Sequence, residues 1–453
     1  MDITALIPQF GSVALTLVAF VVALSVIVAV HEYGHYIVGR WSGIKAEVFS
    51  LGFGPVLYSR TDKRGTLWQI AALPFGGYVK FLGDADAASA GTDSEAVAEL
   101  SPEERRHTMA GAPLWAKTAT VAAGPVFNFA LSILIFAGVI LSQGEARDPL
   151  TVGDLRALPG DVQQLKRGDE VLAMGGVEVP GFDDEAAFRS FGDLIPITRV
   201  VDYKVRRDGT EAVVQGPYPY PPLVTQLAPQ SAAYSIGLAV GDVITHVDGD
   251  PIFAFDQLKE RVEGGEGKPL LLKVWRPGPA GAEELDFTLV PRRTDEPQRD
   301  GGFKTEWRIG IAGGLLFEPV TEHVGVGTAV SAGVVQTGRI IEGSISGLWH
   351  MITGAISSCN MSGPIGIAQV SGQMASQGTE NFIWFIAVLS TAVGLLNLFP
   401  IPVLDGGHLV FYGYEAVAGR PPSDKALRIL MTIGLTLVLS VMLFALSNDL
   451  FCP

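Results

Sequence analysis

The sequence predicts a polytopic α-helical membrane protein that carries a β-hairpin at the membrane and two domains of mixed α/β structure outside it. Three observations predict this class: four long apolar segments, a strand pattern after the first of them, and a polar region with an internal repeat. Of the 453 residues, 48% are hydrophobic. The net charge of −15 argues against nucleic acid as a partner, because phosphates would be repelled.

Each of the four apolar segments is long enough to cross a bilayer as a helix. They run from Val13 to Val38, Thr118 to Leu141, Phe382 to Leu404 and Leu427 to Leu446. The first has no basic start and no obvious small-residue cleavage site, so we expect a membrane helix rather than a cleaved signal peptide. The chain is therefore expected to be a multi-pass protein in contact with lipid.

The distribution of Lys and Arg predicts the orientation of these helices. Residues 1–30 and 429–453 contain no basic residue, whereas basic residues gather in the loops after the first helix and before the last. The positive-inside rule places these loops in the cytoplasm and both termini outside. The segment 143–380 is then extracytoplasmic.

The first apolar segment ends in the sequence His31-Glu32-Tyr33-Gly34-His35. Residues four apart on a helix lie one above the other, so the two imidazoles can share a zinc ion, and Glu32 beside them can act as general base. Purely structural histidines are the alternative, but ionisable groups inside a membrane helix are costly and favour a functional site. Both histidines lie about 7 to 14 Å deeper than Arg40.

The third apolar segment brings a carboxylate to a similar depth. It ends in Asn397-Leu398-Phe399-Pro400-Ile401-Pro402-Val403-Leu404-Asp405. Asp405 is a suitable third zinc ligand and leaves the fourth position open for water. Pro400 and Pro402 either simply end the helix or open its backbone beside a watery cavity. His408 is expected to be structural rather than a ligand.

These two motifs resemble those of the site-2 protease family of intramembrane zinc metalloproteases (family M50), and most closely its bacterial regulator-of-sigma-E protease branch. His31 to His35 matches the family's HExxH, and Asn397 to Asp405 matches its NxxPxPxLDG. Two shorter matches are Gly124-Pro125-Val126-Phe127-Asn128 and Ser362-Gly363-Pro364-Ile365-Gly366.

The resemblance implies Zn²⁺ as cofactor, with His31, His35 and Asp405 as metal ligands and Glu32 as the catalytic base. It places the active site near the cytoplasmic side of a bacterial inner membrane. Asn397 would position the substrate backbone or the oxyanion, although capping a broken helix is an equally good role. The implied substrates are single-span membrane proteins: an anti-sigma factor of a stress response that was cleaved first outside the membrane, and also remnant signal peptides.

The loop after the first helix contains a strand pattern. Glu47–Phe53 and Thr66–Ile70 flank a polar turn at residues 62–65, which predicts a β-hairpin, and Gly76–Phe81 adds a further candidate strand. We expect the hairpin to lie at the membrane and to pair its edge with an extended substrate. An ordinary cytoplasmic hairpin is the alternative. The predicted substrate-binding residues are Gly76, Gly77, Asn397, Pro400 and Pro402.

The extracytoplasmic part contains an internal repeat. Gly168-Asp169-Glu170-Val171-Leu172-Ala173-Met174-Gly175-Gly176 recurs as Gly241-Asp242-Val243-Ile244-Thr245-His246-Val247-Asp248-Gly249. Each copy is a turn, a strand and another turn, and the pattern resembles two PDZ domains. Such domains bind peptide ends by strand addition and carboxylate capture. A steric gate against substrates with large outer domains fits both copies without peptide binding.

Residues Ile309, Gly310 and Ile311 are the candidate carboxylate loop of the second PDZ domain, in a circularly permuted arrangement. A buried strand is at least as good an interpretation of this tripeptide. The corresponding stretch at residues 216–222 has no such tripeptide, so peptide binding by the first domain is in doubt.

Three further features complete the organisation of the chain. Residues 324–357 have the pattern of amphipathic helices on the outer membrane surface rather than of a fifth crossing. Cys359 and Cys452 could pair in an oxidising compartment, but two unpaired thiols are the preferred interpretation. The acidic stretch from Asp84 to Glu104 is predicted to be a linker.

The sequence thus predicts nine regions and leaves two functions to compare. The regions are 1–40 with HExxH, 41–117 with the hairpin, 118–142 as second helix, 143–215 and 216–318 as PDZ domains, 319–380 as amphipathic region, 381–405 as third helix, 406–426 as cytoplasmic loop, and 427–453 as fourth helix and tail. The first function is an intramembrane zinc endopeptidase; the alternative is a catalytically inactive PDZ-containing membrane adaptor. An adaptor has no need of Glu32, which is not a ligand, and its presence favours the enzyme.

Overall fold

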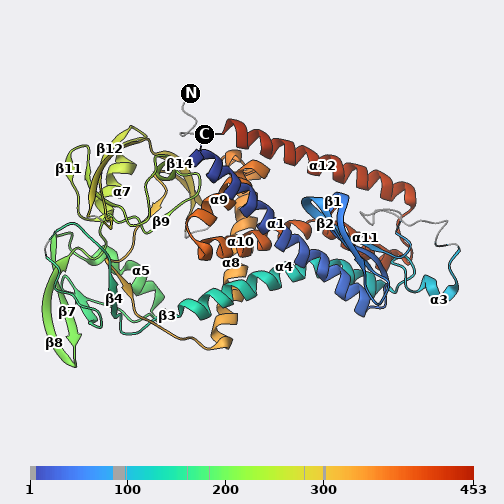
Figure 1. Cartoon of the computed structure of the whole chain (residues 1–453), viewed down its shortest axis with the longest axis horizontal. Helices are drawn as coiled ribbons and strands as arrows, with labels where there is room; N and C mark the ends of the chain where they lie inside the picture. Colours follow the sequence, from blue (N-terminus) through green and yellow to red (C-terminus); the bar gives the residue numbers. More distant parts are fainter. Residues whose placement is uncertain are drawn as a thin grey trace. The chain divides into compact units, whose positions relative to one another are not determined.

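The computed structural model describes residues 7–84, 97, 99–160, 162–182, 184–279, 281–298 and 302–452. It consists of two compact units (Figure 1). The first combines Met1–Val139 with Val326–Pro453, and the second is Ile140–Gly325. Most of the predicted linker between Asp84 and Glu104 lies outside the described residues.

The first unit contains the helices that could cross a membrane. Their candidate spans are Val13–Trp41, Leu114–Gln143, Thr379–Asn397 and Lys425–Phe451. These spans belong to helices α1 (Ile7–Trp41), α4 (Leu114–Gln143), α10 (Thr379–Asn397) and α12 (Asp424–Phe451). Within the described part of the chain no other helix meets the same length and composition, so the prediction of four helices able to cross a membrane is confirmed. The third was predicted to run to Leu404, but α10 ends at Asn397.

Glycines allow α4 to pack closely against two of the other helices. A Cβ on Gly34 of α1 would lie 2.6 Å from the carbonyl oxygen of Ala123. A Cβ on Gly394 of α10 would lie 3.1 Å from the carbonyl oxygen of Pro125 and from Cβ of Asn128. Small residues of this kind let helix backbones approach each other where lipid supplies no hydrophobic driving force. Helix α4 therefore lies in contact with both helices that lead to the predicted metal ligands.

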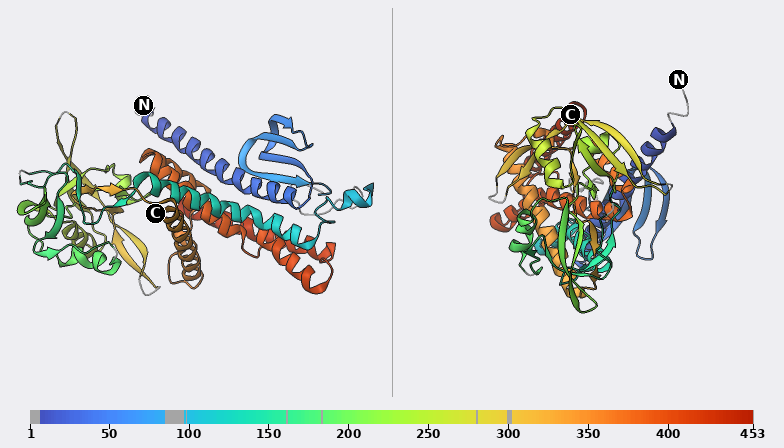
Figure 2. Two further views of the ribbon diagram at one scale, coloured as in Figure 1. Left: turned by 90° about the horizontal axis from the view of Figure 1, so that it is seen from below. Right: turned by 90° about the vertical axis from the view of Figure 1, so that its left-hand side faces the viewer.

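Strands β1 (Ala46–Thr61) and β2 (Leu67–Phe81) form the predicted hairpin. Both are longer than the sequence pattern indicated and both bend, so that the sheet has four strand segments in the order 56–61, 67–71, 48–51 and 77–81. The sheet lies beside the C-terminal half of α1 (Figures 1 and 2). Tyr36 of α1 packs against the rings of Phe49 and Trp68, with centroids 5.8 and 5.0 Å away.

The connection between α10 and α12 is partly helical. Residues 398–404, with Pro400 and Pro402, form a turn, and helix α11 (Asp405–Ala418) follows. The region predicted as a plain loop at 406–426 therefore contains a helix of 14 residues. Proline lacks the backbone donor that a helix needs, which accounts for the break before Asp405.

The segment between the second unit and α10 consists of helix α8 (Val326–Ile352), the 3₁₀ turn η2 (Ser358–Asn360) and helix α9 (Pro364–Ser376). Helix α8 crosses α4 at a steep angle (Figure 1). At the crossing, a Cβ on Gly333 would lie 2.7 Å from the carbonyl oxygen of Ile133. The buried residues of α8, Ala329, Gly333 and Thr337, are four apart and share one face.

Cys359 and Cys452 form a disulfide, so the interpretation as two unpaired thiols is wrong. The two cysteines are 93 residues apart, and the fold brings the end of α12 to η2. Asp449 reinforces this junction, because its carboxylate accepts hydrogen bonds from the backbone N–H groups of Gly363 and Gly366 at the start of α9. A negative charge at a helix N-terminus is favourable. Sequence spacing alone could not show this proximity.

The second unit contains two sheets of four strands with the same order. The first has the order β6-β5-β7-β8 and the second the order β11-β10-β12-β13, both antiparallel. Helix α5 (Glu185–Leu194) belongs to the first copy and α7 (Phe255–Gly264) to the second. The strands of these sheets are β5 (Glu170–Met174), β6 (Val177–Glu178), β7 (Val200–Arg207), β8 (Thr210–Pro217), β10 (Val243–Val247), β11 (Asp250–Pro251), β12 (Leu270–Arg276) and β13 (Glu283–Leu289).

The remaining elements are short. Two-stranded ladders join β14 (Arg292–Pro297) to β15 (Phe303–Arg308), β16 (Ile311–Ala312) to β9 (Gln226–Leu227), β17 (Phe317–Pro319) to β4 (Val152–Leu155), and β18 (Thr321–Glu322) to β3 (Glu145–Ala146). The short helices are α3 (Pro102–Arg105) and α6 (Ala232–Ser235).

Each copy of the repeat contains an ion pair between an arginine and a buried aspartate. Arg207 at the end of β7 donates to both carboxylate oxygens of Asp169, each at 2.7 Å. Arg276 at the end of β12 donates to both oxygens of Asp242 at the same distances. Burial raises the pKa of Asp169, but the hydrogen bonds from Arg207 and from the backbone of Lys166 more than offset this and leave it below its usual value.

We predict that Arg207→Met and Arg276→Met each loosen their own sheet. Each change leaves a buried carboxylate without its paired donor, at a cost of about 2 kcal/mol, so amide hydrogen exchange in that sheet should become about 30-fold faster. The measurement is exchange in the full-length protein. Lys204→Met removes a half-exposed ion pair from β7 and should change exchange little. Equal effects of all three changes would contradict the prediction.

We also predict that no thiol is available for labelling in native membranes. A polyethylene glycol maleimide should leave the mass of the denatured chain unchanged before reduction and should add two groups after it. Cys359→Ser, the control, should accept one group without reduction. Labelling of the wild type before reduction would contradict the disulfide.

Candidate metal centre

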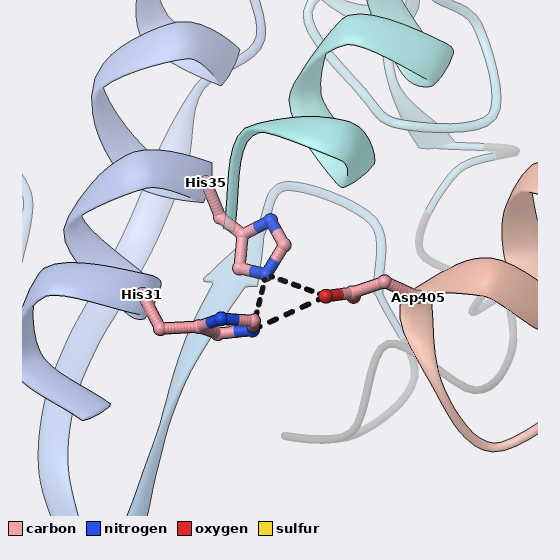
Figure 3. A group of neighbouring side chains, drawn as sticks. All are labelled: His31, His35 and Asp405. Carbon is pink, nitrogen blue, oxygen red and sulfur yellow. Dashed lines mark hydrogen bonds and ion pairs between the residues drawn. The ribbon is translucent and has the colours of Figure 1, made fainter. Parts of the chain in front are cut away.

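Three side chains predicted as metal ligands meet at one point. His31 and His35 lie one turn apart on α1, and Asp405 is the first residue of α11. Nε2 of His31 is 3.1 Å from Nε2 of His35 and 3.1 Å from Oδ2 of Asp405. Nε2 of His35 is 3.5 Å from the same oxygen (Figure 3).

The spacing of these three atoms fits a zinc ion. Zinc–nitrogen and zinc–oxygen bonds of about 2.0–2.1 Å in a tetrahedron place neighbouring ligand atoms about 3.3 Å apart. Oδ2 of Asp405 is buried and accepts no hydrogen bond, which is unfavourable for a carboxylate oxygen unless a cation binds it. Two imidazole nitrogens and one carboxylate oxygen are a ligand set that catalytic zinc sites use.

A hydrogen bond at Nδ1 determines which ring nitrogen of His35 carries the proton. Nδ1 of His35 is 2.9 Å from the carbonyl oxygen of Thr120 on α4. Because a carbonyl oxygen only accepts hydrogen bonds, Nδ1 must carry the proton. In the neutral ring Nε2 then presents a lone pair to the centre of the cluster, as a metal ligand must.

One face of α4 lines the cluster through Thr120, Gly124 and Asn128, which are four residues apart. A Cβ on Gly124 would lie 2.4 Å from Nε2 of His35 and 2.8 Å from Cε1 of His31, so only glycine leaves room for both rings. Nδ2 of Asn128 is 3.1 Å from Nδ1 of His31, and Oδ1 of Asn128 is buried without a partner. Sequence reasoning used Gly124 and Asn128 only as part of a motif match. A polar residue inside an apolar span was the available signal.

The β1–β2 sheet contacts Glu32. A Cβ on Gly77 would lie 3.1 Å from Cγ of Glu32 and 2.7 Å from the carbonyl oxygen of Ser50. The backbone N–H of Val79 donates a hydrogen bond to the Glu32 carboxylate. Gly76 has a positive φ of 145°, which favours glycine. The hydrogen bond to the predicted base therefore comes from strand β2, whereas α4 contacts the histidine rings.

The remaining predicted substrate residues lie at the end of α10 and in the turn before Asp405. Asn397 ends α10, and its Nδ2 donates to the carbonyl oxygen of Val393 at 3.0 Å. Pro402 contacts α12, because a Cβ on Gly434 would lie 3.1 Å from its Cδ. A substrate role for Asn397, Pro400 and Pro402 stays a prediction.

The tripeptide Ile309-Gly310-Ile311 belongs to the second unit. Ile309 is buried in the hydrophobic core of the second repeat, and Ile311 pairs with Leu227. Gly310 has a φ of 78°, in the left-handed region. Its role as a peptide-binding loop stays a prediction.

Comparison with known proteins identifies the family. The model of peptidase family M50 matches residues 19–441. The chain belongs to peptidase family M50. A regulator of sigma E protease from Salmonella typhimurium is 33% identical over 465 residues, which cover 97% of this chain and 99% of that protein. A protein of Agrobacterium fabrum that is named as a zinc metalloprotease is 36% identical over 439 residues, 96% of this chain and 95% of that protein.

This protein is therefore a zinc-dependent protease and a membrane protein. The His-His-Asp cluster is the group of described residues that could hold the ion. The resemblance found in the sequence is thus confirmed for the family, the class of enzyme and the metal.

We predict that Gly124→Ala removes zinc from the purified protein. The added methyl group would overlap both imidazole rings and push them apart. Gly138→Ala, on the same helix, meets no atom within 4 Å and is the matched control. Zinc per chain, measured by atomic emission, should fall for the first variant only. Full zinc content in Gly124→Ala would contradict this packing.

Proposed function

We propose that the protein is an intramembrane endopeptidase that hydrolyses peptide bonds within single-span membrane proteins. The observation that carries this proposal is the cluster of His31, His35 and Asp405. The histidines lie on a helix that could cross a membrane, and Asp405 begins the helix that follows the end of another. Ionisable side chains inside membrane-crossing helices cost free energy, so three of them at one point indicate a functional site.

The position of the disulfide supports the proposed orientation. Disulfides persist in oxidising compartments, so Cys359 and Cys452 belong on the outer side of a bacterial inner membrane. The C-terminal end of α12 is then outside, in agreement with the distribution of Lys and Arg. Both termini and the repeat domains are proposed to be periplasmic, and the metal site to lie toward the cytoplasmic end of α1.

The proposed chemistry uses four side chains. His31, His35 and Asp405 would hold the zinc, which when bound polarises the scissile carbonyl and acidifies a water molecule. Glu32 takes the proton from that water and passes it to the leaving amine. The hydrogen bond from Val79 orients the Glu32 carboxylate for this transfer.

The β1–β2 sheet is proposed to open the substrate. A transmembrane helix hides its peptide groups, whereas a strand paired with a sheet edge presents them. Phe53, Val56 and Leu57 expose apolar side chains, Leu57 to 71%, which suits a sheet that touches lipid. The contact of Gly77 with Glu32 would bring a strand-like substrate to the base.

The two repeats are proposed to be PDZ domains that act as a steric gate. The identical strand order and the duplicated Asp–Arg pair support a common fold for both. A gate would admit substrates whose outer domain has been removed. The relatives named regulator of sigma E protease suggest an anti-sigma factor after its first cleavage, with remnant signal peptides as a second class.

We predict that Glu32→Gln abolishes cleavage but keeps one zinc per chain. The amide cannot accept the proton, yet it is not a ligand, so at least about a hundredfold of rate should be lost. The assay is cleavage of a single-span reporter by detergent-purified protein, with zinc measured in parallel. Glu342→Gln, an exposed residue of α8, is the control and should cleave normally.

Three outcomes of this assay carry different conclusions. Loss of cleavage with zinc retained would assign Glu32 as a catalytic group. Equal cleavage by wild type and Glu32→Gln would reject this site. Zinc binding without cleavage of any single-span reporter by the wild type would favour the inactive adaptor.

A further inference from the structure

Asn128 is the polar side chain of α4 that faces the metal cluster. It is fully buried, and its amide is 3.1 Å from Nδ1 of His31, the ring nitrogen that points away from Asp405. A buried amide in an apolar helix costs free energy unless its hydrogen bonds are made. The contact with His31 is the hydrogen bond of this side chain, and its other polar atom, Oδ1, is without a partner.

The metal site determines which way this hydrogen bond must run. Nε2 of His31 faces Asp405 and His35, so a bound metal takes the lone pair of Nε2. A neutral imidazole with a free Nε2 lone pair carries its proton on Nδ1. That N–H needs an acceptor, but the nearest atom of Asn128 is Nδ2, which is a donor. Turning the amide by 180° exchanges Nδ2 for Oδ1 without a change of shape and gives the proton its acceptor.

We propose that Asn128 is a positioning residue for the metal site, whose side-chain Oδ1 accepts the Nδ1 proton of His31 and so fixes the tautomer and plane of that ring. His35 already has such a partner in the carbonyl oxygen of Thr120. One face of α4 would then supply the outer hydrogen bond of both histidine ligands. Partners of this kind hold the ring and make it a stronger ligand.

The backbone of Asn128 is itself held in place. Its carbonyl oxygen accepts hydrogen bonds from Ser132 at 3.0 Å and from Ser390 of α10 at 2.9 Å. Ser132 also donates to the carbonyl oxygen of Ala387 at 2.8 Å. These bonds tie Asn128 to α10, so the side chain has a fixed origin from which to orient His31.

The proposal rests on the proposed metal ligands and is tested by zinc affinity rather than by cleavage. Zinc would be competed from detergent-purified full-length protein with a chelator. Asn128→Leu has a similar shape but no acceptor, and its affinity should fall 10- to 100-fold. Asn128→Asp can only accept a hydrogen bond from His31. Its zinc affinity should lie within about threefold of that of the wild type or be higher.

Asn128→Asp distinguishes the two directions of the hydrogen bond. If the wild-type amide donated its N–H to His31, the substitution would remove that bond, because an ionised aspartate has no hydrogen to donate. A tenfold or greater loss of affinity in Asn128→Asp would overturn the proposal, and so would unchanged affinity in Asn128→Leu. Thr337→Val, which removes a buried hydroxyl of α8 that donates to the carbonyl oxygen of Gly333, is the control and should bind zinc as the wild type does. A loss of zinc affinity in this control as large as that in Asn128→Leu would instead assign Asn128 a role in packing.

A second measurement separates this proposal from the metal assignment. Replacing zinc with Co²⁺ gives visible absorption bands that report the ligand geometry; these should be kept in Asn128→Asp and altered in Asn128→Leu. If the wild type binds one metal that His31→Ala loses, the ligands are correct whatever Asn128 does. A wild type that binds no metal would overturn both proposals.

Discussion

The close approach of two imidazoles and a carboxylate inside a helix bundle is the constraint on which the first unit depends. Three polar groups within 3.5 Å of one another and largely shielded from water are unfavourable unless their charges are balanced, which a bound cation would do. To bring them together, α1 and the end of α10 must both pack closely against α4. Gly34 and Gly394 allow this approach, and Gly124 leaves the space for the rings. The same positions therefore serve helix packing and ligand geometry at once.

The predicted base is held by a different element from the ligands. Glu32 projects from α1, but its hydrogen bond comes from Val79, and Gly77 lies against its side chain; both residues are on β2. A sheet that is also proposed to receive the substrate would thus orient the proton acceptor. This arrangement couples the position of a bound strand to the position of the group that reacts with it, within a single small sheet.

The sequence contained enough to predict the meeting of His31, His35 and Asp405, the four long apolar helices and the hairpin. His31 and His35 are local in sequence, and helix periodicity alone makes them neighbours. Asp405 could be placed because the first and third helices were both predicted to run from the outer to the cytoplasmic side of the membrane, so that their C-terminal ends reach a similar depth. The hydrogen bonds of Thr120 and Asn128 depend on how α4 packs and rotates, which no local pattern specifies. Helix α11 was missed because glycines and prolines suggested a loop, and the disulfide was missed because pairing across 93 residues is a property of the fold.

The junction between the end of α12 and the start of α9 limits how the helices can separate. A covalent bond joins Cys359 to Cys452, and Asp449 holds the first N–H groups of α9. Helix α9 in turn contacts α1, where Gly372 meets Thr16. The disulfide and these hydrogen bonds therefore keep the C-terminal end of α12 beside the start of α9, so the two helices cannot separate at that end.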